Sequence, residues 1–338
     1  MNETVTIREQ KPRKRIEIPR LAVSKRFGMY KDEEKKEVRK ADVKEGVMSQ
    51  LLKRWEEYNR ILGNAPIRYE NEIIEGYVKA LDAVRGACFS PEDVDALHVP
   101  FMVFHDMEDY PSRAGLFLSA LINSGKDESY LLNVDRFGPK MKLCEQDFLK
   151  RWIDRLHTDI RHLGYRNSKN LIIEGNLVNH VGDNMLSGSI VMRGYYNGGV
   201  GLGMENGTIT VEGKTGGPIG MNMLGGTIMV ECCIGGDGIG MYMEGGTIVI
   251  RRGAVKGADG VGARMNGGYI QANANVDGPV GSDMSGGVIV IRGNVTGFQG
   301  VVGSGMTGGE IYMDGEIRKI GDVKHGKIFH WGRLIVDK

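Results

Sequence analysis

The segment 280–293 reads VGSDMSGGVIVIRG, and close copies of it occur seven times in the chain. Each copy has a glycine, a methionine three residues later, a second glycine at six and an isoleucine at eight. Successive methionines lie 19, 19, 20, 22, 19 and 22 residues apart. This period is typical of a solenoid, in which each unit buries its apolar side only by stacking on its neighbours. The first glycine and the methionine of the copies are Gly182 and Met185, Gly201 and Met204, Gly220 and Met223, Gly240 and Met243, Gly262 and Met265, Gly281 and Met284, and Gly303 and Met306.

Each copy predicts one short strand between glycine corners. Alternating side chains, as in Ile289 to Arg292, indicate one apolar and one polar face. The paired glycines before the isoleucine, such as Gly286 and Gly287, suit corners with positive φ or a close neighbouring backbone. A coil of about 20 residues is too short for a helical crossover, so parallel strands must be joined by tight turns. The sequence therefore predicts a parallel β-helix of about seven coils, with methionine and isoleucine ladders inside it.

Composition divides the 338 residues into parts. Of the 51 glycines, 42 follow Asn170, and the net charge of +1 conceals no strongly basic domain. We expect a basic, partly disordered tail over 1–42, a helical α/β cap domain over 43–169, the β-helix over 170–316 and a C-terminal plug over 317–338. The cap closes one end of the β-helix, because an open solenoid end exposes strand edges and core. We expect Phe329 and Trp331 to plug the other end.

Hydrophobic spacing predicts the elements of the cap. A helix is expected from Val47 to Leu62, with Leu51, Trp55 and Tyr58 on its buried face. Four further elements are expected over 99–104 (strand), 112–123 (helix), 130–134 (strand) and 146–163 (helix). A second helix over 71–87 is expected to bury the side chains Ile74, Tyr77, Val78, Leu81 and Val84.

Several functional classes lack their sequence signals. No run of 18 apolar residues and no apolar leader is present, so we expect a soluble cytoplasmic protein that does not enter a membrane. No G-K-[ST] phosphate-loop ending follows the glycine run 235–240, and the chain has no G-x-S-x-G nucleophile elbow. We expect no cofactor to be bound by this chain alone. The four cysteines form no C-x-x-C pair: Cys88, Cys144, Cys232 and Cys233.

One group of residues is a candidate catalytic or metal site in the glycine-poor half. The group follows the expected strand 99–104, where an α/β protein places its site, and could hold a divalent ion. A solvated acidic turn is the alternative interpretation, and it is the one that such a composition favours. The members of the group are His105, Asp106, Glu108 and Asp109.

The remaining histidines are expected to have packing or capping roles. His157 and His162 are five residues apart, which does not align two ligands on a helix. His180 opens the first coil, where the other coils have different residues, and His325 and His330 fall in the C-terminal plug.

The repeat V-G-x-x-M-x-G-G-x-I-x-V-x-G resembles the GXGXG domain family, over about 170–316. That family includes the C-terminal domain of the glutamate synthase large subunit and one of the subunits of formylmethanofuran dehydrogenase. The resemblance implies a right-handed β-helix that holds catalytic domains or subunits at fixed distances, while the chemistry takes place elsewhere. The N-terminal half matches neither enzyme. Asn2 stands where a glutaminase needs a cysteine after initiator removal, and no flavin-binding barrel fits in the preceding half.

The resemblance implies a non-catalytic scaffold subunit of a cytoplasmic complex of the glutamate synthase or formylmethanofuran dehydrogenase kind. Its partners would be other protein subunits, and a homo-oligomer is an option. One alternative is an enzyme whose site lies near His105 and Asp106. A second alternative is an RNA- or ribosome-associated factor that uses the basic arm from Lys11 to Arg26; outside that arm, nucleic-acid binding is not indicated.

Overall fold

The computed structural model describes residues 38–63, 66–87, 89–95, 97, 110–134, 160–175, 178–196, 198–236, 238–297 and 299–338. The chain divides into two compact units, Met1–Gly46 and Val47–Lys338. The second unit holds the solenoid and the helices that contact it. The expected strand over 99–104 and the basic arm from Lys11 to Arg26 lie outside the described residues.

In the described residues, four helices precede the solenoid: α2 (Val38–Leu62), α3 (Glu70–Val84), α4 (Pro91–Asp95) and α6 (Tyr110–Ser124). Helix α2 begins inside the segment expected to be a tail, and its residues Leu51, Trp55 and Tyr58 are fully buried, as predicted. The ring of Phe117 from α6 packs 5.2 Å from that of Trp55. No helix in the described part of the chain has the length and apolarity needed to cross a bilayer.

The buried side of α3 differs from the expected one. Tyr77 and Val84 are buried, but Ile74 and Val78 are 44% and 49% exposed. The side facing the core also includes small residues, and a Cβ at Gly76 would lie 3.1 Å from Cδ1 of Leu116 in α6. The prediction placed the large apolar side chains in the core. The helices instead pack closely through the side of α3 that carries small residues.

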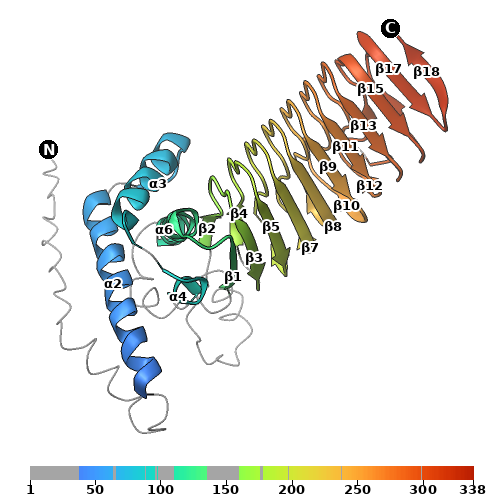
Figure 1. Cartoon of the computed structure of the whole chain (residues 1–338). Coiled ribbons are helices and arrows are strands. Elements are labelled where there is room, and N and C mark those ends of the chain that lie inside the picture. The colour runs from blue at the N-terminus through green and yellow to red at the C-terminus, as the bar shows by residue number, and fades with distance from the viewer. Residues whose placement is uncertain are drawn as a thin grey trace, which may run out of the picture. The chain divides into compact units, whose positions relative to one another are not determined.

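The described residues of 129–133 and 160–338 form a parallel β-solenoid of about nine turns (Figure 1). Ten strands stack in parallel, and β18 (Arg333–Asp337) closes the sheet as an antiparallel edge strand. Shorter strands form the other sides of the coils: β2 (Ile160–Leu163), β4 (Val178–Val181), β6 (Tyr195–Tyr196), β10 (Gly253–Val255), β12 (Asn275–Val276), β14 (Val301–Val302) and β16 (Lys319–Ile320). The ten stacked strands are β1 (Ser129–Asn133), β3 (Asn170–Glu174), β5 (Ser189–Arg193), β7 (Thr208–Thr215), β8 (Thr227–Gly236), β9 (Thr247–Ile250), β11 (Tyr269–Ala272), β13 (Val288–Ile291), β15 (Thr307–Met313) and β17 (His325–His330).

The parallel β-helix is confirmed, and it is longer than the seven repeats suggest. Strand β1, expected in the cap, pairs with β3 so that Tyr130 lies beside Leu171. Tyr130 and Leu132 point into the same core as the isoleucine ladder, without a glycine–methionine motif in their coil. The expected helix over 146–163 is wrong at its end, because Ile160–Leu163 is strand β2 and pairs with β4. Its remaining residues, 146–159, lie outside the described part.

Two glycines of the repeat make room for side chains of the neighbouring coils. A Cβ at Gly220 would lie 2.5 Å from Cδ1 of Ile248 in the following coil. A Cβ at Gly246 would lie 2.7 Å from Cε of Met223 in the preceding coil, and 2.8 Å from the carbonyl oxygen of Gly226. Both glycines have positive φ, which L side chains rarely adopt. The methionines and isoleucines of all seven copies are fully buried, which confirms the two predicted ladders.

The aromatic side chains at the C-terminal end do not form the expected plug. Ile328 points inward and is fully buried, so the alternation of the strand turns Phe329 outward. Phe329 stacks on Tyr312 with ring centroids 4.5 Å apart. Trp331 is 65% exposed, and its indole N–H donates to the carbonyl oxygen of Asp314. The prediction assigned the aromatic residues to the wrong side of β17.

We expect Gly246→Ala to lower the free energy of unfolding by about 3 kcal/mol or more. The new methyl group meets a neighbouring coil, and strain at positive φ and overpacking each cost about 1–3 kcal/mol. Urea unfolding followed by circular dichroism measures the effect. Gly46→Ala is the control, because a Cβ there meets no atom within 4 Å. Equal stability of the Gly246 variant and the wild type would contradict the interlocking of coils.

Met243→Ala tests the buried ladder in the same way. Truncation of a buried methionine costs about 2–5 kcal/mol, whereas Met243→Leu is expected to cost less than about 1.5 kcal/mol. Met241→Ala is the matched control, because Met241 lies in the same coil and is half-exposed; its effect should be within about 0.5 kcal/mol. Equal losses for the two alanine variants would show that the methionine ladder does not carry the packing.

Candidate functional site

Helix α6 packs directly on strand β2 at the start of the solenoid. A Cβ at Gly115 would lie 1.7 Å from the carbonyl oxygen of Arg161, so no side chain fits between the helix and the strand. The buried hydroxyl of Ser119 lies 3.0 Å from the carbonyl oxygen of His162. It also accepts hydrogen bonds from the N–H of Gly164 at 2.9 Å and of the next residue at 3.2 Å. Ser119 therefore fixes the turn that follows His162 and β2.

A second contact joins α3 and α6 to the same turn. The amide of Asn123 donates to the hydroxyl of Tyr77 at 2.8 Å and to the carbonyl oxygen of Tyr165 at 3.1 Å. The two tyrosine rings meet edge to face, with centroids 5.0 Å apart. Burial raises the pKa of both phenols, so they act as neutral hydrogen-bonding groups at pH 7. The turn after β2 is thus held on two sides.

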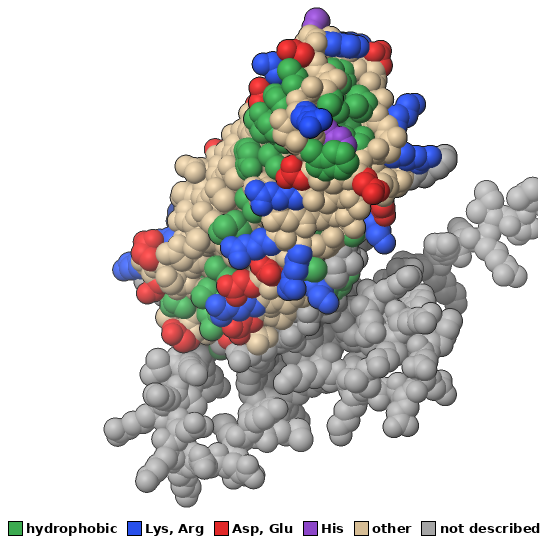
Figure 2. All heavy atoms as spheres, turned by 90° about the vertical axis from the view of Figure 1, so that its right-hand side faces the viewer, with side chains coloured by type: hydrophobic (Ala, Val, Ile, Leu, Met, Phe, Trp, Pro, Cys, Tyr) green, Lys and Arg blue, Asp and Glu red, His purple; other side chains and the backbone are tan. Residues whose placement is uncertain are grey.

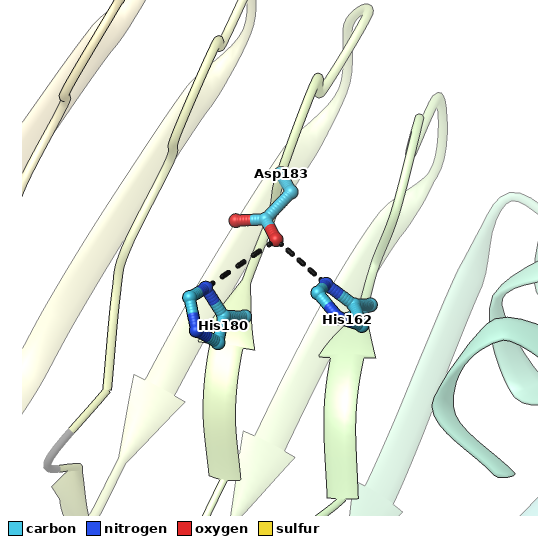
Figure 3. Close-up of side chains that lie close together, drawn as sticks. All are labelled: His162, His180 and Asp183. Atoms are coloured by element: carbon cyan, nitrogen blue, oxygen red, sulfur yellow. Dashed lines mark hydrogen bonds and ion pairs between the residues drawn. The ribbon is translucent and has the colours of Figure 1, made fainter. Parts of the chain in front are cut away.

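Two histidines lie side by side on β2 and β4. The pairing of Arg161 with Asn179 and of Leu163 with Val181 places His162 next to His180 in the neighbouring coil. Their rings stack with centroids 5.2 Å apart and an interplanar angle of 28°. Figure 3 shows that both rings turn a nitrogen towards the same carboxylate.

That carboxylate belongs to Asp183, in the turn after β4. Its Oδ2 lies 2.9 Å from Nδ1 of His162 and 3.7 Å from Nδ1 of His180. Asp183 is 6% exposed and His162 is 7% exposed, whereas the His180 side chain is 39% exposed. The cluster is thus buried on the side of α6 and open on the side of His180.

The three side chains offer two imidazole nitrogens and a carboxylate oxygen, all within 4.8 Å of one another. Among the described residues, this is the one group of three or more possible ligands that lie close enough together to share an ion. Neutral imidazole and carboxylate are common ligands of divalent transition metals. The same groups could instead form a buried hydrogen-bonded pair with a neighbouring ring.

Among the described residues, the histidines that the sequence singled out do not join this cluster, apart from His162 and His180. His105, Asp106, Glu108 and Asp109 lie outside the described residues, as does His157. His325 lies on β17 at the opposite end of the sheet. On the same strand, Nε2 of His330 lies 2.9 Å from the carbonyl oxygen of Gly315.

The sequence analysis missed the grouping of His162 with His180. It treated the segment before 163 as helical, and a helix does not align these positions. The available signal was their separation of 18 residues, close to one coil. Asp183 gave a second signal, because none of the other six copies of the repeat has a carboxylate directly after its first glycine; beyond the copies, Asp322 follows Gly321.

Comparison with known proteins adds no assignment. No family model, curated protein or solved structure matches the chain.

Ser119→Ala is expected to destabilise the junction of α6 with the first coil. It leaves the buried N–H of Gly164 without its acceptor, whereas the N–H of Tyr165 keeps the carbonyl oxygen of His162, and such an orphan costs about 1–3 kcal/mol. Urea unfolding should show a loss of that size, and amide exchange should accelerate at Gly164. Ser187→Ala is the control, because Ser187 is exposed. Unchanged exchange at Gly164 would show that the hydroxyl does not hold the turn.

Proposed function

We propose that this chain is a non-catalytic structural subunit that holds other protein subunits at fixed positions. The complex would be of the glutamate synthase or formylmethanofuran dehydrogenase kind, which the repeat resembles. The solenoid supports this proposal, because its coils interlock through buried side chains and it would resist bending.

The outer face of the sheet also suits a structural role. Arg193 lies 3.3 Å from Glu174 and 2.8 Å from Glu212, in the coils before and after it. Such exposed pairs add little stability, but they leave the row of charges balanced. Half-buried apolar side chains, including Val249 and Val290, form a parallel row beside these charges. A flat surface of this mixed character is typical of protein–protein contacts.

The observation that carries the proposal is the exposed apolar end of the solenoid. Trp331 is 65% exposed, Leu334 47% and Ile335 42%. All three lie on β18 or in the turn before it. Figure 2, which looks onto this end, shows hydrophobic side chains gathered between charged ones. In the described residues, β18 pairs on one edge only, with β17. An exposed apolar edge strand is a surface for pairing with another chain.

A second copy of this chain fits that edge. The strand β18 reads RLIVD, from Arg333 to Asp337. If two copies pair antiparallel about a two-fold axis at Ile335, each Arg333 lies opposite the other copy's Asp337 in the strand register, and the register shift of β18 against β17 lies at the axis. Opposite charges facing across strands stabilise the pairing, and the contact is the same for both copies. The resulting dimer would join two solenoids end to end and present two sets of partner surfaces.

Charge reversal tests the dimer. Arg333→Asp or Asp337→Arg places like charges opposite each other, so we expect each change to raise the dimer dissociation constant at least about tenfold. The double variant restores opposite charges and should restore the dimer. Analytical ultracentrifugation measures the association, with Lys319→Asp as a control on an exposed strand away from β18. A monomeric wild type, or no recovery in the double variant, would contradict the pairing.

Purification from the native source under mild conditions tests the wider proposal. We expect other protein subunits to remain bound, identified by mass spectrometry. A protein recovered without any such subunit would count against the scaffold. The two alternatives depend on residues outside the described part, namely the site near His105 and Asp106 and the arm from Lys11 to Arg26. RNA binding that weakens steeply with salt and is lost on deletion of the arm from Lys11 to Arg26 would favour the second of them.

A further inference from the structure

We propose that His162, His180 and Asp183 bind one divalent transition-metal ion of the zinc class. The inference is independent of the scaffold proposal, because it depends on side chains at the opposite end of the solenoid from β18. It rests on the spacing of the ligand atoms, the backbone at the two histidines and the burial of the carboxylate.

The ligand atoms have nearly the spacing that an ion requires. Ligands about 2.0–2.1 Å from a tetrahedral ion lie about 3.3 Å apart. Oδ2 of Asp183 lies 2.9 Å from Nδ1 of His162 and 3.7 Å from Nδ1 of His180, one shorter and one longer than this value. Small rotations of the side chains would equalise the distances. Binding through Nδ1 would require the tautomer of His162 that carries its proton on Nε2.

The backbone at both histidines is in a conformation that favours glycine. His162 has φ +61° and His180 has φ +57°. Among the residues that precede the bridge in later coils, Gly238 with φ +67° and Gly260 with φ +56° share this conformation, whereas Gly199, Pro218 and Pro279 do not. A non-glycine residue in this region costs about 1–3 kcal/mol, and such strain is concentrated at functional sites. The first two coils therefore have histidine where glycine would be unstrained.

The carboxylate of Asp183 is buried without a full set of partners. Its Oδ1 accepts no hydrogen bond within the described structure, and no described lysine or arginine forms an ion pair with it. Later coils place Leu202, Met221 or Ser282 at this position, and those residues are half-exposed. A buried carboxylate is costly unless a cation or hydrogen-bond donors compensate for it. A bound divalent ion would supply that compensation.

The ligand set indicates the kind of ion. Two imidazoles and one carboxylate suit Zn²⁺, Co²⁺ or Fe²⁺ better than Mg²⁺ or Ca²⁺, which prefer oxygen ligands. Three protein ligands leave one position for water, on the exposed side of His180. Because closed four-ligand sites hold zinc most firmly, we expect this ion to exchange with chelators without unfolding the chain. The bound ion would join β2 to β4 at the start of the solenoid.

The test uses the full chain, stripped with a chelator and titrated with Zn²⁺ and with Co²⁺. We expect one ion per chain by calorimetry and elemental analysis, and visible absorption from bound Co²⁺. His180→Gly should weaken binding about 100-fold or more, since even the loss of an outer-shell partner costs about 10–100-fold. This variant should keep the fold, because two later coils have glycine at the same position.

Three measurements decide the outcome. His325→Gln removes an exposed histidine at the far end and should bind as the wild type does. Zn²⁺ should raise the melting temperature of the wild type and not that of His180→Gly. Asp183→Asn keeps the side-chain shape and should also lose the ion, which provides a second test if His180→Gly does not fold. Equal binding by the wild type and either ligand variant, or no binding by the wild type, would make the cluster a structural hydrogen-bonded pair.

Discussion

Side chains of each coil occupy the spaces that glycines leave in the neighbouring coils, and the solenoid cannot form without this fit. Each coil places an isoleucine against the first glycine of the preceding coil and receives that coil's methionine beside its own second glycine. Gly220 with Ile248 and Gly246 with Met223 are examples. Because every coil both provides and fills such a space, neighbouring coils can stack in only one strand register. Parallel strands, tight corners and an apolar interior all follow from this register.

The solenoid is regular where this exchange operates, and the candidate site lies where it starts. The first coil has no preceding glycine–methionine unit, so α6 takes that place, with Gly115 against the backbone of β2. The hydroxyl of Ser119 in α6 then holds the turn after β2, by accepting a hydrogen bond from the N–H of Gly164. This change of neighbour buries His162 and Asp183 at positions equivalent to half-exposed or glycine positions later on. The start of the solenoid can therefore bury a polar cluster, whereas the regular coils bury apolar side chains.

The two ends of the solenoid are covered differently. Helices pack on the first coil and shield a polar cluster, whereas the last coil ends in β18, whose side chains Leu334 and Ile335 face solvent. Between them, the outer face has balanced charges and few features that distinguish one coil from another. A structural role for the shaft and specific roles for its ends are consistent with this distribution.

Glycine spacing and hydrophobic period were enough to predict the parallel β-helix, its two ladders and the buried face of α2, because both are local properties that every copy repeats. The buried side of α3, the outward direction of Phe329 and the position of the strand holding His162 beside β4 became known from the folded structure alone. Those outcomes depend on which surfaces pack together. The residue pattern of one segment does not say which other segment it will pack against. His162 and Asp183 are 21 residues apart in sequence. They became a candidate site only when the coil brought them within hydrogen-bond distance.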